Sequence, residues 1–331
     1  MPQVPLEWIS DPRIFVALER PWSALRESDP DATPFHTPEY LKLYWEELGA
    51  GRLSVALIGG RDRPAGICPF EIHEGLLSFL GGYEVTDYMG PVGLTDERGR
   101  VAKELMEGLA ARDDWARADL EGLAEDGTWL SALAEAAADA GLRPEVEDDD
   151  VAPMLHLPPT WEAYLASLRA KQRHEVRRKA RRLRDAFPDA RLARSTPDTL
   201  GPDLEWFAEM HRSAAGKKGR FMRPGMELFF RRLGEELLPR GVLRLLFLEA
   251  DGSKLAGMIA FELEGTVSLY NSAYDPRHRA VAPGMVLIAE LIADAIARGC
   301  RRLDMLKGDL GYKYRFGARP RAIKRLLLER P

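Results

Sequence analysis

The amino-acid sequence predicts an α/β protein built from two domains of the same fold, each a mixed (α+β) sheet with flanking helices. The chain has 331 residues, 45% of them hydrophobic, and a chain of this length usually forms two domains with sizeable cores. Two segments, 53–82 and 243–274, have the alternating apolar pattern and the turn residues of a three-stranded antiparallel meander. These two segments match in sequence, and the two halves of the chain carry opposite charge.

The two meanders match at a nearly constant offset. Ala65-Gly66 lies 191 positions before Ala256-Gly257. After a slip of one residue, Glu74-Gly75 lies 190 positions before Glu264-Gly265. Because the matches keep their register within the expected strands, they favour a duplicated fold unit. We therefore predict that Ala65-Gly66 and Ala256-Gly257 occupy equivalent strands.

Charge divides the chain into an acidic half and a basic half. Residues 1–150 carry 13 Lys and Arg against 31 Asp and Glu, whereas residues 151–331 carry 34 against 21. Opposite charge fits two domains whose fields attract each other. The basic half is the better candidate for an anionic ligand.

A domain boundary is expected near residue 155. The acidic run EVEDDD at 145–150 precedes a proline-rich stretch that ends at Thr160. The predicted domains are therefore 1–154 and 155–331.

The first domain is expected to open with helices over residues 5–49. The clearest begins after Thr37, because Thr37 can cap a helix and Pro38 suits its first position. The meander follows. Then we expect a helix near 97–110, a strand near 116–120 and a helix near 128–140.

A basic helix is predicted at the start of the second domain, capped by Thr160, beginning at Trp161 and ended by Pro188. Residues 169–184 include nine Lys or Arg and one acid. A charge run of this kind is usually a solvated helix face. It also suits an anion, such as the phosphates of a carrier, a nucleotide-linked substrate or the acceptor stem of a tRNA. Arg173 and Arg177 are the substrate-binding candidates in it.

A helix from Gly284 to Gly299 is predicted after the second meander, preceded by the polar loop DPRHRAVAP. The first turn of a helix offers unpaired N–H groups and the positive end of its dipole, so this junction can bind an anion. A plain strand-to-helix connection is the alternative. The candidate binding residues are Arg277, Arg279, Gly284 and Met285.

Composition and the absence of certain motifs argue against several classes of protein. Cys68 and Cys300 are too few for a disulfide framework, the N-terminus has no basic segment followed by an apolar run, and a cytoplasmic location is expected. No window is apolar enough for a membrane helix. The six histidines have no metal-site spacing, so we predict no metal. Nucleophile-elbow, phosphate-loop and dinucleotide motifs are absent from the sequence.

The segments SAYDPRHRAVAPG, LDMLKGD and YKYRFG together resemble the second domain of acetyltransferases related to FemAB-type peptidoglycan aminoacyltransferases. That family consists of two GNAT-like acyltransferase domains. The resemblance continues through the basic helix and through EMHRSAAGKKG, and more weakly through PFHTPEYLKLYWEELG and GGYEVTDYMGP. It implies tandem GNAT-like domains. In GGYEVTDYMGP, Asp87 and Tyr88 are candidates for substrate binding.

The resemblance also implies catalytic residues. FemAB-type enzymes supply a lysine from a Phe-Lys pair followed by Phe-Gly, and YKYRFG resembles this motif with Tyr312 in place of the Phe. Lys313, on a loop expected between a strand and a last helix, is thus the candidate that stabilises the oxyanion of acyl transfer. Asp304 is either a base or an ion-pair partner of Arg301 or Arg315. Tyr274 is the first candidate to protonate a leaving thiolate, although strand aromatics are more often core.

The implied reaction is acyl transfer, most simply of an acetyl group, from coenzyme A to a small-molecule or peptide amine. The diphosphate would lie at the Gly284 helix, although ordinary acetyltransferases have more glycines in this loop. Transfer from an aminoacyl-tRNA to a cell-wall precursor is the close alternative. A third hypothesis is a binding module without catalysis, which uses the basic half to hold nucleic acid or another anionic polymer.

Overall fold

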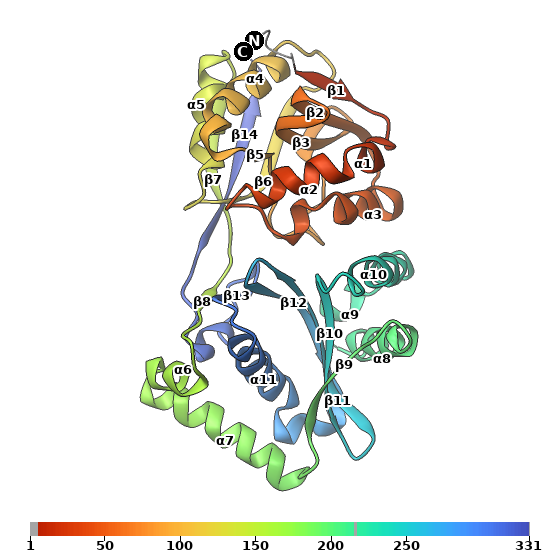
Figure 1. The fold of residues 1–331 in the computed structure, drawn as a ribbon, viewed down its shortest axis with the longest axis vertical. Coiled ribbons are helices and arrows are strands. Elements are labelled where there is room, and N and C mark those ends of the chain that lie inside the picture. The colour runs from red at the N-terminus through yellow and green to blue at the C-terminus, as the bar shows by residue number, and fades with distance from the viewer. Residues whose placement is uncertain (1–5, 215–216, 331) are drawn as a thin grey trace. The chain divides into compact units, whose positions relative to one another are not determined.

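A computed structural model describes residues 6–214 and 217–330 and divides the chain into two compact units (Figure 1). Unit 1 comprises Met1–Val151 and Arg321–Pro331, and unit 2 comprises Ala152–Pro320. The first crossing between the units lies close to the boundary predicted near residue 155. The structure differs from the prediction at the end of the chain, which returns to unit 1.

Unit 1 is a sheet covered by helices. Its strands are paired in the order β1-β2-β3-β4-β6-β14-β7, and β5 pairs with β3. The strands are β1 (Glu7–Ile9), β2 (Arg52–Gly60), β3 (Arg63–His73), β4 (Leu76–Phe79), β5 (Val92–Gly93), β6 (Arg117–Ala124), β7 (Arg143–Val151) and β14 (Ala322–Glu329). The helices are α1 (Ile14–Ala17), α2 (Glu19–Glu27), α3 (Pro38–Leu48), α4 (Arg98–Ala110) and α5 (Trp129–Asp139), with 3-10 turns η1 (Pro34–His36) and η2 (Thr95–Glu97).

Unit 2 has a second sheet, with strand order β8-β13-β12-β11-β10-β9. The strands are β8 (Met154–His156), β9 (Arg191–Arg194), β10 (Leu243–Ala250), β11 (Ser253–Leu263), β12 (Thr266–Tyr274) and β13 (Arg302–Asp304). The helices are α6 (Trp161–Ser167), α7 (Ala170–Ala186), α8 (Leu200–Arg212), α9 (Lys217–Phe221), α10 (Pro224–Leu237) and α11 (Pro283–Ala297), with 3-10 turns η3 (Pro276–Val281) and η4 (Lys313–Phe316). Helix α11 covers one face of this sheet, and α8 and α10 cover the other (Figure 1).

The predicted duplication is confirmed by the two meanders. Strand β3, which contains Ala65-Gly66, is the middle strand between β2 and β4, as β11 with Ala256-Gly257 is between β10 and β12. Both final turns use the predicted Glu-Gly pair, and all four residues have positive φ, as a tight hairpin turn requires. The carbonyl of each turn glycine, Gly75 or Gly265, then accepts hydrogen bonds from the parallel strand that follows.

The units differ in the loop that follows their third meander strand. In unit 2, β12 continues along β11 as far as Tyr274, which pairs with Ala256. In unit 1, β4 ends at Phe79, and β5 instead pairs with Gly66 and Ile67 after an intervening loop, residues 80–91. Two side chains of this loop, Tyr88 and Met89, are buried in unit 1, with exposed fractions of 3% and 6%.

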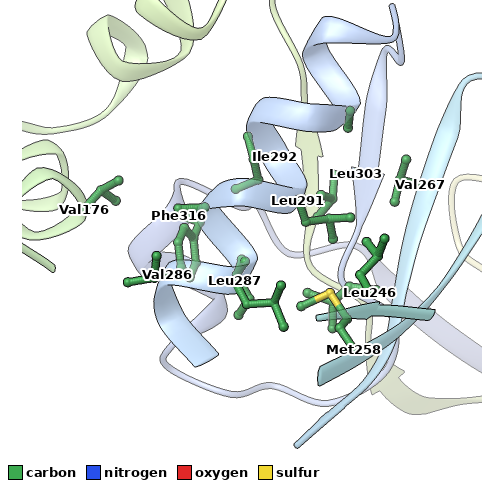
Figure 2. Packing of buried hydrophobic residues seen from close by; sticks show 14 of the residues in the cluster. Val176, Leu246, Met258, Val267, Val286, Leu287, Leu291, Ile292, Leu303 and Phe316 are labelled. Carbon is green, nitrogen blue, oxygen red and sulfur yellow. The ribbon is translucent and has the colours of Figure 1, made fainter. Parts of the chain in front are cut away.

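Helix α11 is the central helix of the unit 2 core. Leu287 and Leu291 point toward the strands, where they meet Leu246 and Met258 (Figure 2). On another side of the helix, Val286 lies near Phe316 (Figure 2). Because α11 is buried on several sides, its N-terminus is held in a fixed position relative to β12.

The acidic run 145–150, which was used to predict the domain boundary, is a strand. It forms most of β7, the edge strand of the unit 1 sheet, and pairs with β14. Charge explains why so acidic a segment is stable there, because Lys324 of β14 pairs with Asp148 at 2.6 Å. Charged residues also protect a sheet edge from pairing with another chain.

Three further expectations need correction. The helix predicted from Trp161 to Pro188 is two helices, α6 and α7, because Leu168 and Arg169 are extended. The segment 5–49 contains the strand β1 besides its helices. The last element among the described residues is the strand β14, where a helix was expected. Within residues 6–214 and 217–330, no helix is long and apolar enough to span a membrane.

Candidate functional site

Unit 2 contains a cavity of about 1060 Å³. It is bounded by the first turn of α11, the second half of β12, the chain that follows β13, and parts of α7, α8 and α9. The lining residues are Lys179, His211, Phe221, Leu269, Tyr270, Asn271, Ser272, Tyr274, Arg279, Ala282, Pro283, Gly284, Met285, Ile288, Met305, Lys307, Leu310, Tyr312, Lys313 and Arg315.

The cavity exists because two parallel strands diverge. Only Thr266–Ser268 of β12 pairs with β13, at Arg302–Asp304. Beyond Ser268, β12 has no strand partner on this side among the described residues, and residues 269–272 and 274 line the cavity. Backbone groups along this edge can therefore meet an extended ligand.

The N-terminus of α11 forms one wall of the cavity. Its N-cap, Ala282, has left-handed φ and ψ of 51° and 54°, and Pro283 occupies the first turn. Gly284 and Met285 follow and both line the cavity. Since Pro283 has no N–H, the first turn offers fewer backbone donors than most helices, but its dipole still favours an anion.

The two arginines before α11 have different surroundings. Arg279 lines the cavity. Arg277 is not among the lining residues, and its side chain is 80% exposed and held by Asp275, with Nε donating to Oδ2 at 2.8 Å. This hydrogen bond from Arg277 holds the pKa of the Asp275 carboxyl below its usual value. The geometry favours Arg279 over Arg277 for contact with a ligand.

Lys313 lies in the cavity wall and is 2% exposed. Its Nζ donates to the carbonyl oxygens of Leu306 and Lys307, at 2.7 and 2.8 Å. Leu306 has a left-handed φ of 58°, which is uncommon for a branched residue. Lys313 therefore brings a buried positive charge to the cavity and also fastens the turn at residues 306–307.

The other predicted catalytic residues are Asp304, which is buried, and Tyr274, which is partly exposed. Asp304 is 3% exposed at the end of β13, and its Oδ1 accepts the N–H of Leu306 at 2.8 Å. It is not among the residues that line the cavity. Tyr274 is 40% exposed and lines the cavity beside Gly284. Their catalytic roles stay predictions.

The basic residues predicted to bind substrate lie on α7 and not in the cavity lining. Arg173 donates through Nη1 to the carbonyls of Leu165 and Leu168, at 3.3 and 3.2 Å, so it satisfies the C-terminal end of α6. Arg177 is exposed. The substrate contact of Arg173 and Arg177 therefore stays a prediction, and of the two only Arg177 has an exposed side chain.

Asp87 and Tyr88, the remaining substrate-binding candidates, belong to the loop 80–91 of unit 1. Asp87 is half-buried, and the Arg321 guanidinium lies 5.4 Å from the ring centroid of Tyr88. Tyr88 borders a cavity of about 30 Å³, room for about one water molecule. Nearby, the N–H of Met89 donates to Gly122 of β6 at 3.2 Å.

Several residues that line the cavity were not predicted from the sequence. His211 of α8 and Asn271 of β12 form a hydrogen bond of 3.0 Å, and Lys307 and Tyr312 also line the cavity. Burial raises the pKa of the Tyr312 phenol. His211 could have been predicted because it lies in EMHRSAAGKKG, one of the segments that resemble the family. Two residues of that segment, Ala215 and Gly216, lie outside the described residues.

The composition of the lining limits its chemistry. Five cationic side chains and a histidine line the cavity, and no Asp or Glu is among its described lining residues. Nowhere in the described chain do three His, Cys, Asp or Glu side chains gather as metal ligands. The cationic side chains are Lys179, Arg279, Lys307, Lys313 and Arg315. Such a wall suits a ligand with negative charges.

Comparison with known proteins agrees with this geometry. Residues 170–314 match the sequence profile of the acetyltransferase (GNAT) domain. No curated protein matches the chain. The matched residues run from the start of α7 to η4 and so include every lining residue except Arg315.

Several solved structures have the same fold. A conserved protein of unknown function from Bacteroides thetaiotaomicron has a TM-score of 0.66 at 15% identity, covering 98% of this chain and 100% of that one. FemX has a TM-score of 0.66 at 11% identity, covering 93% and 95%. A tandem GNAT protein from the clavulanic acid biosynthesis pathway has a TM-score of 0.52 at 12% identity, covering 98% and 99%.

The tandem neighbour agrees with the duplicated meanders, and the profile match falls on the unit that holds the cavity. Residues 170–314 are therefore similar to the acetyltransferase (GNAT) domain, and the chain as a whole has the two-domain fold that FemX and the tandem GNAT protein also have.

Proposed function

We propose that this chain transfers an acyl group, most simply acetyl, from acyl-coenzyme A to an amine, and that the reaction occurs in the unit 2 cavity. The observation that carries this proposal is the cavity itself. It joins a helix N-terminus, an open strand edge and five cationic side chains, and it has no carboxylate in its described lining. These features suit a long anionic carrier with a pantetheine arm.

The carrier has a natural place along β12 and α11. The diphosphate would lie at the first turn of α11, where the helix dipole and Arg279 favour negative charge. The pantetheine amides would bond to the open edge of β12 beyond Ser268. This orientation directs the thioester toward the point where β12 and β13 separate.

The chemistry requires an uncharged amine. Its nitrogen lone pair forms the new C–N bond with the thioester carbonyl carbon, the C–S bond breaks, the amine loses a proton and the thiolate gains one. A cationic wall without carboxylates lowers the pKa of a bound amine, because like charges disfavour its protonated form. Tyr274 and Lys313 both line the cavity. In this proposal Tyr274 returns a proton to the thiolate, and Lys313 stabilises the oxyanion.

Acetyl-coenzyme A binding tests the carrier site, and the two arginines form a matched pair. Arg279→Ala should weaken binding about tenfold, as expected when a charge-assisted hydrogen bond is lost. Arg277→Ala should leave the affinity nearly unchanged, because that side chain is turned to Asp275. Titration calorimetry on the full chain measures both. Equal losses, or no binding by the unaltered protein, would place the carrier elsewhere.

Transfer from an aminoacyl-tRNA is a second candidate, favoured by the surface of α7. Six of its cationic residues are exposed and have no ion pair within the described chain: Lys171, Arg177, Arg178, Arg181, Arg182 and Arg184. Phosphate binding would make affinity for tRNA fall steeply with salt. Changing three of these arginines to glutamine should then abolish tRNA binding without affecting coenzyme A. Acetyl transfer by that variant at the original rate would show that the basic face is not needed for the reaction.

A further inference from the structure

We propose that Asn271, held in place by His211, forms a subsite that binds a carboxylate oxygen of the amine acceptor. This inference rests on the proposed function, because it concerns the second substrate of the same cavity. It assigns the acceptor to a chemical class, amines that also carry a carboxylate. Asn271 is the specificity-determining residue, and His211 is its positioning residue.

The orientation of the Asn271 amide follows from its two contacts. One terminal atom lies 2.9 Å from the backbone nitrogen of Ser272 and 3.0 Å from Nε2 of His211. A backbone N–H can only donate, so this atom must be the amide oxygen, Oδ1. An amide oxygen can only accept, so Nε2 of His211 carries a proton.

The other half of the amide, the Nδ2 group, is available to a ligand. With Oδ1 occupied, the Nδ2 group keeps two N–H donors, and it has no hydrogen bond to any described residue. Asn271 lines the cavity. Two donors on one nitrogen, at a cavity wall, recognise an oxygen acceptor.

The fold holds this pair rigidly. His211 is 1% exposed, and its ring contacts the rings of Phe207 and Phe221, at centroid distances of 5.9 and 5.5 Å. The register of β12 shifts between Leu269 and Asn271, so Tyr270 is an extra residue. Because of this bulge, Tyr270 and Asn271 both face α8 and α10, while Leu269 packs with α11 on the opposite face.

This placement separates the subsite from the proposed carrier site. The first turn of α11 lies on one face of β12, and the His211–Asn271 pair lies on the other. The cavity is lined from both faces. A ligand group at Asn271 therefore belongs to the acceptor, which would approach the thioester from the side of α8.

The charge of the cavity decides which oxygen is favoured. Lysine and arginine side chains line it without a described Asp or Glu, and Glu175, which pairs with Lys179 and Arg315, lies outside the lining. An anionic oxygen is more favourable here than a neutral carbonyl, since hydrogen bonds to charged groups are the stronger ones. Phe221 and Tyr270 add an aromatic wall next to Asn271.

The chain offers an unusually direct probe, because Asn271 is its single asparagine. Protein labelled with ¹⁵N only in the asparagine side chain gives one NH₂ pair of NMR signals, and both report on this amide. We would titrate the full chain with L-phenylalanine and with phenethylamine, which has the same ring and amine but no carboxylate. A saturable shift of the NH₂ signals by phenylalanine alone is the expected result.

Variants identify the contact. Asn271→Ala and Asn271→Asp should each weaken phenylalanine binding at least about tenfold in calorimetry, since one removes the donors and the other replaces them with negative charge. Their affinity for acetyl-coenzyme A should stay the same, which also shows that they fold. For His211, Gln retains an N–H donor and Phe does not, so His211→Gln should keep more of the carboxylate selectivity than His211→Phe.

Two results would overturn the inference. One is an equal shift by phenethylamine, and the other is no shift by either probe in protein that binds acetyl-coenzyme A. Failure of the proposed donor is separate from both, because it would appear as absent acetyl-coenzyme A binding while the NH₂ signals still respond to phenylalanine.

Discussion

At the scale of single residues, Lys313 combines two tasks in one ammonium group. Its charge lies in the cavity wall, and two of its N–H donors fasten the carbonyls of Leu306 and Lys307. Sequence motifs identify such a lysine but do not reveal what it touches. The two tasks predict different losses when it is replaced.

Replacing Lys313 by methionine should lower kcat about a hundredfold or more while acetyl-coenzyme A affinity stays nearly intact, because an oxyanion donor acts mainly in the transition state. The free energy of unfolding should also fall by about 1–3 kcal/mol, since two carbonyls lose a buried donor. Single-turnover rates, calorimetry and chemical denaturation measure the three quantities. Loss of affinity together with rate would instead indicate contact with the carrier in the ground state.

His36 of unit 1 predicts a pH dependence of stability. Burial lowers the pKa of its imidazole from 6.5 to about 4, against the opposing charges of Asp29 and Asp31. Its Nδ1 accepts the N–H of Thr33 at 3.0 Å, so a proton there would remove the acceptor. The unfolded chain then binds the proton more readily than the folded one, and stability falls as the pH drops from about 6.5 toward 4.

This contribution is of the order of 3 kcal/mol at its full extent. We expect His36→Asn to flatten that part of the pH profile, because its amide oxygen can replace Nδ1 as acceptor but does not titrate. Urea denaturation at several pH values compares the two proteins. The contribution of the carboxylates to the pH dependence is common to both and cancels in the difference. Superimposable profiles would contradict the assignment to His36.

At the scale of elements, the hairpin turns of the two meanders are the most local evidence of duplication. Gly75 and Gly265 have φ of 80° and 73° at equivalent turns. Alanine at either position should cost about 1–2 kcal/mol, the usual penalty of left-handed backbone for a residue with a Cβ. The two losses should be similar.

Gly99 is the matched control for those glycines. It lies in α4 with ordinary φ, and a Cβ added there would meet nothing within 4 Å. Gly99→Ala should therefore be neutral or slightly stabilising. Thermal melts of the three variants compare them, and a Gly265→Ala protein as stable as Gly99→Ala would show that the turn does not require glycine.

Elements also show where local pattern reading fails. Alternating strands, the Thr37 cap and the α11 periodicity were predictable, because each depends on neighbours a few residues away. That the acidic run 145–150 forms a strand was not predicted, because its pairing with β14 joins residues far apart in the chain. The break at Leu168 depends on burial against the unit 2 core, which helix-forming residues around it do not reveal.

At the scale of the whole molecule, unit 1 completes its sheet with a strand that follows unit 2 in the sequence. Strand β14 follows unit 2 in sequence but lies between β6 and β7 of unit 1, where Leu326 and Leu328 are fully buried. Strand β8 precedes the rest of unit 2 and pairs with β13. Unit 1 is therefore discontinuous in sequence, whereas unit 2 is a single continuous segment.

Truncation after Pro320 should consequently unfold unit 1, because it removes an interior strand and its buried leucines. Five of the seven tryptophans lie in unit 1, so their fluorescence reports on it. Within the full chain, Leu326→Ala should cost about 2–5 kcal/mol, as for a large-to-small change in a core. Glu329→Ala, an exposed position of the same strand, is the control, and native-like tryptophan emission from the truncated chain would contradict the prediction.

The sequence by itself determined the fold class, the two meanders, their duplication and a helix N-terminus suited to an anion. These features depend on the period of apolar residues and on turn chemistry, which act over short stretches. The GNAT resemblance, confirmed by comparison, came from motifs close together in the chain, SAYDPRHRAVAPG and YKYRFG.

Only the tertiary structure decided where the site lies and what it contains. In both units the third meander strand pairs with the following parallel strand over only three residues. In unit 1 the loop 80–91 occupies the space beyond this pairing, whereas in unit 2 that space is a cavity. His211 and Asn271 are 60 residues apart and meet only because a bulge turns Asn271 toward α8. Such contacts depend on how elements pack, and packing is set by side chains from distant parts of the chain.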